Sequence, residues 1–120
     1  MRNILLLRLD EMPFDAVVIR HTLSTETGFR DVRFHDPGGA AIEADYSEPE
    51  DWTIVSLSKG LSRISLSGTS DAALRAALIL QRHLKVPLRI IDTDYSFDLV
   101  LSDFQTVEQL RAAMDKAEES

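Results

Sequence analysis

The stretch from Ser62 to Leu101 constrains the fold more than any other part of the sequence. It reads as a strand, a helix and two further strands. The helix is expected from Asp71 to about Lys85, with Thr69 or Ser70 as its N-cap, and it ends before Val86-Pro87. Its buried stripe is expected to comprise Leu74, Ala77, Leu78 and Leu84. The strands on either side of the helix form a βαβ unit, which should be right-handed if they lie parallel in one sheet.

A hairpin is predicted just before this helix. Two alternating runs, Trp52–Ser58 and Leu61–Ser67, are separated by Lys59-Gly60, where glycine can adopt the positive φ of a tight turn. The register around that turn gives two opposed pairs on one face, Val55 with Ile64 and Leu57 with Ser62. Trp52 falls on the other face with Ile54, and we expect it to be exposed.

Further strands are expected at Ile4–Leu9, Phe29–His35, Ala41–Tyr46, Leu88–Ile91 and Tyr95–Leu101, with a turn at 36–39. The first is an apolar run typical of a central or doubly covered strand. The third alternates, with Ile42, Ala44 and Tyr46 on one face. In the last, Tyr95, Phe97, Leu99 and Leu101 share a face.

Two more helices complete the pattern. Residues 13–27 can form a helix between Pro13 and Gly28, with Phe14, Val17, Val18 and His21 on one side, although the β-branched run Val17-Val18-Ile19 argues against it. A capping box from Thr106 to Gln109 begins a helix from Val107 to about Ala117, which buries Val107, Leu110 and Met114.

The predicted architecture is therefore α+β in one domain, residues 1–120. It has a mostly antiparallel sheet of about six to seven strands and three helices on one side, in the order β-α-β-β-β-β-α-β-β-α. With 120 residues, the chain can bury a sizeable core without disulfides, and it contains no cysteine.

Charge restricts the partners. The 20 acidic and 13 basic residues give a formal net charge of −7, which repels nucleic acid and anionic membranes and attracts basic proteins. The run Ile4–Leu7 is too short to span a bilayer, and Asp10 and Glu11 follow it, so we expect a strand there and a cytoplasmic protein.

The sequence gives little support for catalysis. Asp92 and Asp94 follow a strand and could together hold a magnesium ion, but turn chemistry explains them better. His21, His35 and His83 lie on separate elements without metal-ligand spacing. The recurrent serines alternate with apolar residues, as on the solvent-exposed face of a sheet, and none lies in a nucleophile elbow. We therefore expect no cofactor, no metal and no enzyme, with a small enzyme using Asp92 and Asp94 left as an alternative.

One segment is a candidate partner-binding site. It combines carboxylates with aromatic side chains: Glu43, Asp45, Tyr46, Glu48, Glu50, Asp51 and Trp52. Carboxylates can meet a basic partner, while tyrosine and tryptophan are the anchors that interfaces favour. A solvated loop is the other interpretation, because charge clusters with proline usually are loops.

The segments LSGTSDAALRAAL and DYSFDLVL, and the order of elements over roughly residues 52–117, resemble small bacterial immunity-type proteins of contact-dependent or secreted polymorphic toxin systems. The resemblance implies a cytoplasmic, non-catalytic protein that binds one cognate toxin and blocks its active site. No functional residue carries over from it. A homo-oligomeric adaptor or structural module, associating through Trp52 and Ile54, remains a further alternative.

Overall fold

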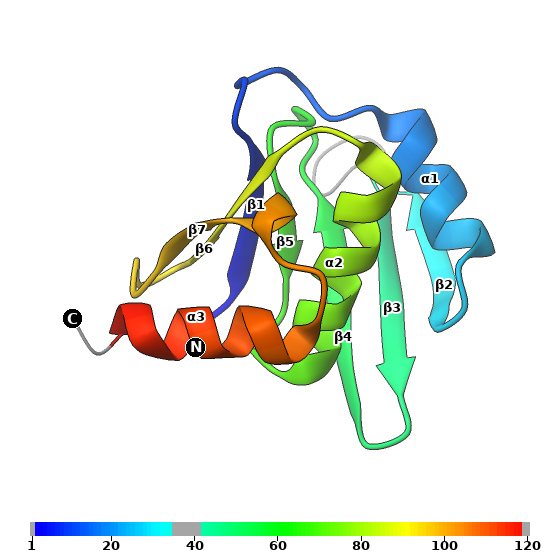
Figure 1. The fold of residues 1–120 in the computed structure, drawn as a ribbon. Helices are drawn as coiled ribbons and strands as arrows, with labels where there is room; N and C mark the ends of the chain where they lie inside the picture. Colours follow the sequence, from blue (N-terminus) through cyan, green and yellow to red (C-terminus); the bar gives the residue numbers. More distant parts are fainter. Residues whose placement is uncertain (1, 35–41, 119–120) are drawn as a thin grey trace.

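The computed structural model describes residues 2–34 and 42–118, which form one seven-stranded antiparallel sheet and three α-helices (Figure 1). The strands are β1 (Ile4–Arg8), β2 (Phe29–Phe34), β3 (Ile42–Glu48), β4 (Asp51–Leu57), β5 (Ile64–Leu66), β6 (Leu88–Asp92) and β7 (Asp98–Val100). The helices are α1 (Ala16–Thr25), α2 (Asp71–Leu84) and α3 (Val107–Glu118), with a 3-10 turn, η1 (Leu101–Asp103), before α3. The predicted fold class and element order are confirmed, while the turn predicted at 36–39 lies outside the described residues.

The sheet has the spatial order β2-β3-β4-β5-β1-β6-β7, so the first strand of the chain lies in its interior. Both β5 and β6 pair with β1 in the antiparallel direction. They are therefore parallel to each other, with α2 connecting them. The predicted βαβ unit exists, with one strand inserted between its two strands.

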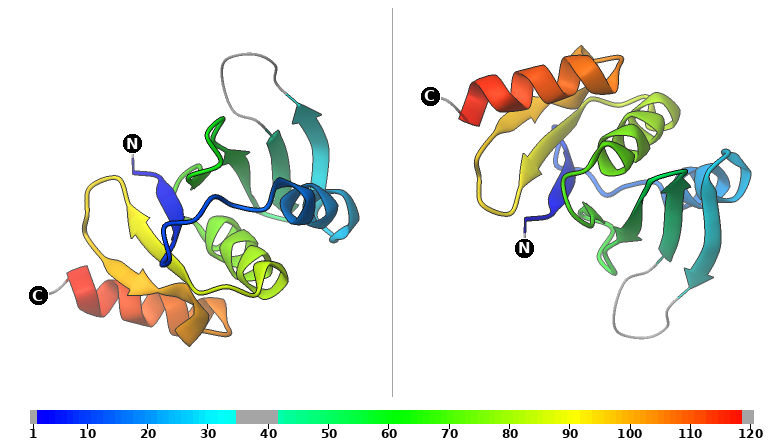
Figure 2. Two further views of the ribbon diagram at one scale, coloured as in Figure 1. Left: turned by 90° about the horizontal axis from the view of Figure 1, so that it is seen from above. Right: turned by 90° about the horizontal axis from the view of Figure 1, so that it is seen from below.

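All three helices lie on the same side of the curved sheet (Figure 2). The central helix, α2, packs on β3 and β4 and also contacts α1 and α3. Its buried residues include four alanines, which allow close approach to the sheet: Ala72, Ala73, Ala76 and Ala77. The core therefore lies between α2 and the inward-facing residues of the strands.

The predicted stripe of α1 is wrong in part: Phe14 is buried as expected, but Val17 and His21 are exposed. Ile19, Thr22 and Leu23 are buried, whereas Val17 is 75% exposed. The helix begins later than predicted because the Asp15 carboxylate accepts hydrogen bonds from the N–H groups of Val17 and Val18 and so acts as N-cap.

The register predicted for the β4–β5 hairpin is also wrong: it differs from the observed pairing by two residues. Leu57 pairs with Ile64, and Val55 pairs with Leu66. The connection is wider than a two-residue turn, because the Ser58 N–H bonds to the Arg63 carbonyl and the left-handed residue is Leu61, with φ +59°. A shift of two residues leaves each side chain on the same face of the sheet. Trp52, Ile54 and Ser56 therefore still point away from the helices.

The segment predicted as one strand from Tyr95 to Leu101 is a strand only in part, because residues 95–97 are irregular and Leu101 begins η1. Strand β7 contains only Asp98–Val100, and Tyr95 is left-handed, with φ +55° and 66% of its surface exposed. The Asp92 carboxylate accepts the Ser96 N–H at 2.6 Å, which extends the turn to Ser96. Tyr95 therefore does not share the buried environment of Phe97 and Leu101.

Candidate protein-interaction surface

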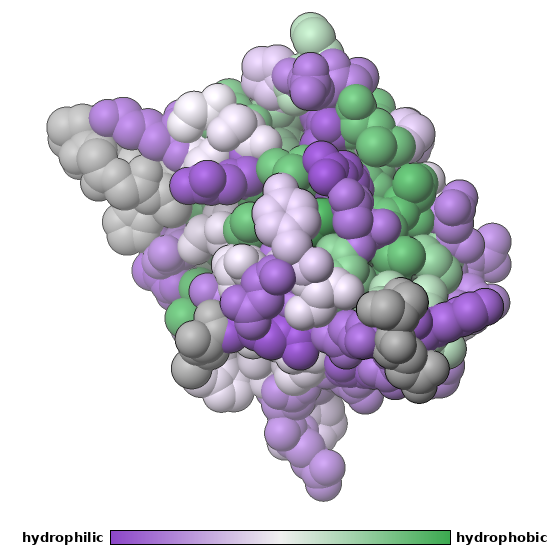
Figure 3. All heavy atoms as spheres, turned by 90° about the vertical axis from the view of Figure 1, so that its left-hand side faces the viewer, coloured by the Kyte–Doolittle hydropathy of each residue, from purple (hydrophilic) through white to green (hydrophobic). Residues whose placement is uncertain are grey.

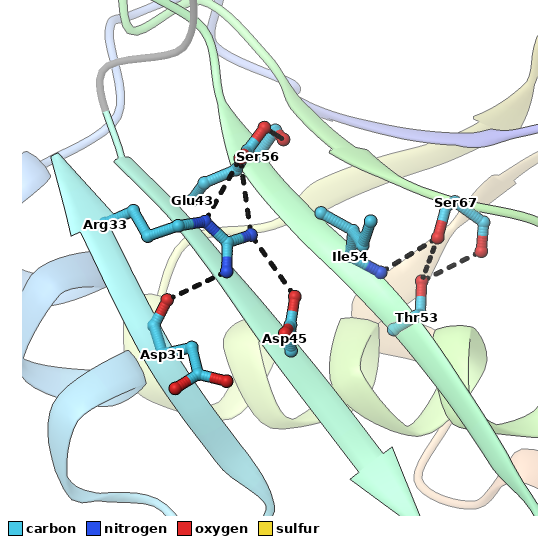
Figure 4. A network of polar contacts seen from close by, with 8 residues as sticks. All are labelled: Asp31, Arg33, Glu43, Asp45, Thr53, Ile54, Ser56 and Ser67. Carbon is cyan, nitrogen blue, oxygen red and sulfur yellow. Dashed lines mark hydrogen bonds and ion pairs between the residues drawn. The ribbon is translucent and has the colours of Figure 1, made fainter. Parts of the chain in front are cut away.

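The helices leave the other face of the sheet without a helical layer, and we call this surface the open face. Strand pairing identifies its residues, among which are Leu5, Leu7, Arg33, Glu43, Asp45, Ile54, Ser56, Ser65, Arg89, Ile91 and Val100. In Figure 4 the open face points toward the viewer, with a helix behind the strands. An antiparallel sheet can face solvent on one side in this way.

Trp52 is the most exposed large apolar residue of the open face, with 60% of its surface accessible. It lies near the start of β4, opposite Ser47 of β3. The sheet fixes its backbone, so a partner that covered the indole would lose little backbone entropy on binding. The predicted exposure of Trp52 is confirmed.

Asp51, the residue before Trp52, has a structural task. Its carboxylate accepts the Ala72 N–H at 3.0 Å and the Trp52 N–H at 2.9 Å. The bond from Ala72 is the main reason that the pKa of Asp51 lies below its usual range. Ser70 occupies the N-cap position of α2 but makes no side-chain capping bond, so a carboxylate from β4 caps this helix.

Glu43 and Asp45 are paired with a cation on the neighbouring strand. The Arg33 guanidinium lies 3.3 Å from a Glu43 oxygen and 3.2 Å from an Asp45 oxygen (Figure 4). The bond to Asp45 is the leading cause of the raised pKa of Arg33. Ser56 also donates to Glu43, at 3.0 Å. Much of the negative charge of these two residues is therefore compensated within the protein.

Tyr46 and Glu48 contact the interior and the helix layer. Tyr46 is only 5% exposed, and its ring lies 4.8 Å from that of Phe29. Its hydroxyl donates to Glu48 at 3.1 Å, and Arg75 of α2 pairs with the same carboxylate. Burial is the main cause that raises the pKa of Tyr46 to about 12. The ring of Tyr46 is consequently not available as a surface anchor.

Glu50 is exposed in the turn between β3 and β4 and forms no ion pair within the described part of the chain. Of the seven residues predicted to bind a partner, Glu50 and Trp52 are therefore the two left exposed and uncommitted. The turn of the β3–β4 hairpin, which bears them, projects beyond the ends of the neighbouring strands, as Figure 1 shows.

The apolar part of the open face was not predicted from the sequence. Leu5 and Leu7 of β1 are half-buried, and they lie beside Ile91 and Arg89 of β6. Figure 3 views the molecule from the β6–β7 side and shows hydrophobic residues between hydrophilic ones. The expected single layer of helices could have revealed this surface, because it leaves one face of β1 without cover.

The other candidate sites are explained by local structure. Asp92 is fully buried and accepts the Arg2 Nε–H at 2.7 Å as well as the Ser96 N–H. Burial alone would raise the pKa of Asp92, but the bonds from Ser96 and Arg2 outweigh it and hold the pKa below its usual range. His83 pairs with Glu26, and His35 lies outside the described residues. Over residues 2–34 and 42–118, no group of three metal-ligating side chains comes together.

Comparisons with protein-family models, curated proteins and solved structures found no match. Within the described ranges, none of the helices is both long and apolar enough to cross a membrane.

Proposed function

We propose that this chain is a non-catalytic binding protein that uses the open face around Trp52 to inhibit a basic protein partner. The exposed indole of Trp52 on a rigid sheet is the observation that carries this proposal. Rigid aromatic side chains at the centre of an interface commonly account for most of its binding energy. The net charge of −7 supports a basic partner, because complementary charge raises the association rate.

Immunity to a bacterial toxin is the most specific form of the proposal. The sequence resembles such proteins over roughly residues 52–117, and their mode of action needs a stable binding surface and no catalytic group. In this form, the chain acts in the cytoplasm and covers the active site of the toxin. Glu50 is the carboxylate best placed to meet a basic group, because Glu43, Asp45, Glu48 and Asp51 already have partners in the protein.

The test is binding to the product of the reading frame adjacent to the gene. Trp52→Ala should weaken the affinity by about thirtyfold or more, the effect of losing an interface hot spot. Tyr95→Ala is the matched control, because Tyr95 is 66% exposed but lies in the β6–β7 turn. Equal affinities for both variants would exclude the surface around Trp52. Full growth inhibition of cells that express both proteins would reject the immunity role.

Self-association is the second candidate function, favoured by the apolar residues Leu5, Leu7 and Ile54 on the same face as Trp52. An exposed apolar surface on a sheet can pack against a second copy. Light scattering coupled to size-exclusion chromatography separates the two candidates. A dimer that Trp52→Glu dissociates would favour the structural module, and a monomer would favour the inhibitor.

A further inference from the structure

We propose that the cleft between α2 and the segment from η1 to the start of α3 binds a small amphipathic anion. The cleft has a volume of about 690 Å³, which lies within the range of small-molecule sites. One wall comes from α2, and the other is formed by residues 102–108. It lies on the helical side of the sheet, so this inference is independent of the function proposed for the open face.

The floor of the cleft is apolar. It is formed by Leu78 and Ile79 of α2, together with Phe104 and Val107. Ile79 and Val107 are buried, while Leu78 and Phe104 are only half-buried and keep apolar surface in contact with water. A ligand with an aliphatic or aromatic tail would remove that surface from water, which is favourable in proportion to the area covered.

Seven polar side chains line the cleft: Glu108, which acts on Arg75, and six others that form two groups. Three are engaged with the protein: Arg75 with Glu48, Gln81 with the Val86 carbonyl and the Leu88 N–H, and Thr106 with the Gln109 N–H. Three others, Arg82, Ser102 and Gln105, make no side-chain hydrogen bond or ion pair to any described residue. The cleft thus combines an apolar floor with donors that the protein itself does not use.

Charge distinguishes the two ends of the cleft. Arg75 is paired with Glu48, and Glu108 also contributes to the raised pKa of Arg75, so carboxylates compensate that end. Arg82 lies seven residues further along α2, which corresponds to about 10 Å on a helix. Its guanidinium is a cation without a carboxylate partner among the described residues. The anionic head of a ligand therefore fits at Arg82, with its tail along Leu78 and Ile79 toward Arg75.

The probe is 8-anilinonaphthalene-1-sulfonate, whose sulfonate and rings match this pattern and whose fluorescence rises in apolar surroundings. We expect saturable one-to-one binding to the folded protein. Octanoate should displace the probe at a lower concentration than 1-octanol, because only octanoate has a charge for Arg82. Arg82→Gln should weaken probe binding by about fivefold, the size expected for a solvent-exposed ion pair. Leu78→Glu should weaken it by tenfold or more, because it places a carboxylate on the apolar floor.

Arg63→Gln is the matched control, because Arg63 is an exposed cation next to β5, away from the cleft, and forms no ion pair to a described residue. It should leave the affinity for the probe unchanged. Circular dichroism of each variant checks that the fold is retained. If Leu78→Glu does not fold, the comparison of Arg82→Gln with Arg63→Gln still tests the proposal. Non-saturable fluorescence, equal effects of the two arginine variants, or equal displacement by octanoate and 1-octanol would overturn the proposal.

Discussion

The two faces of the sheet belong to the same strands, but they are stabilised in different ways. On the inner face, Ile4, Leu6 and Ile64 have no exposed surface, because the helices cover them. On the open face, Leu5 is only half-buried. Its neighbour on β5 is the polar residue Ser65, which in turn pairs with Ser56 of β4. The inner face thus provides most of the hydrophobic stabilisation, although Ile91 on the open face is also buried.

The largest expected difference between the faces concerns two neighbours in β1. Leu6→Ala should lower the free energy of unfolding by about 3 to 4 kcal/mol, because it removes buried methyl groups and leaves a cavity. Leu5→Ala should cost about 1 kcal/mol, because that side chain is only partly removed from water. Urea denaturation of both variants measures the two costs. Equal losses would show that the open face is as important to stability as the core.

Alkaline pH should lower the free energy of unfolding through Tyr46, which lies on the inner face. The pKa of Tyr46 is raised to about 12, while an unfolded chain has the ordinary value near 10. A raised folded-state pKa contributes stability below about pH 10, and this contribution is lost as the pH rises from about 10 to about 12. The loss should reach about 2 to 3 kcal/mol.

Tyr46→Phe should remove most of this pH dependence, while Tyr95→Phe should leave it in place, because Tyr95 is exposed. Denaturant unfolding at a series of pH values provides the measurement. A steep alkaline loss that persists in Tyr46→Phe would assign the effect to another group.

A smaller effect is expected at the β3–β4 hairpin. Asp51→Ala should cost about 1 kcal/mol, because the Ala72 N–H loses its capping carboxylate. Glu50→Ala, one residue earlier, should change stability by less than about 0.5 kcal/mol, since Glu50 is exposed. Thermal unfolding of the two variants compares a structural carboxylate with a free one. A larger cost for Glu50→Ala would contradict this division of the acidic segment.

The smallest effect on stability is expected at Trp52 itself. Because the indole is 60% exposed, Trp52→Ala should change the free energy of unfolding by less than about 1 kcal/mol, although it removes the largest side chain of the open face. A loss of several kcal/mol in urea denaturation would give Trp52 a structural role and weaken the case for a binding site.

Much of the fold could be predicted because hydrophobic patterns record which face of an element is covered. Alternation placed Ile42, Ala44 and Tyr46 on one face of β3, and all three are buried. The same alternation should have removed Tyr46 from the candidate site. The stripe of α1 could not be derived reliably, because both Val17 and Ile19 are apolar and only the contacts of the folded helix decide which is buried.

The hairpin register and the acidic segment could not be predicted for a different reason. Glycine is the usual residue at positive φ, so the sequence favoured a turn centred on Gly60, whereas Leu61 adopts that conformation. The pairing of Arg33 with Glu43 and Asp45, and of Arg75 with Glu48, depends on which strands and helices become neighbours. A count of charges cannot distinguish such paired carboxylates from the exposed Glu50.

The central claim is that the open face around Trp52 binds the partner, and Trp52 is the only tryptophan of the chain. Labelling with 5-fluorotryptophan therefore gives one fluorine resonance that reports on this position alone. In the free protein, the resonance should shift between H2O and D2O, as expected for an exposed indole. On addition of the partner, it should move and lose this solvent dependence. A resonance that stays in place and remains solvent-dependent in the saturated complex would contradict the account.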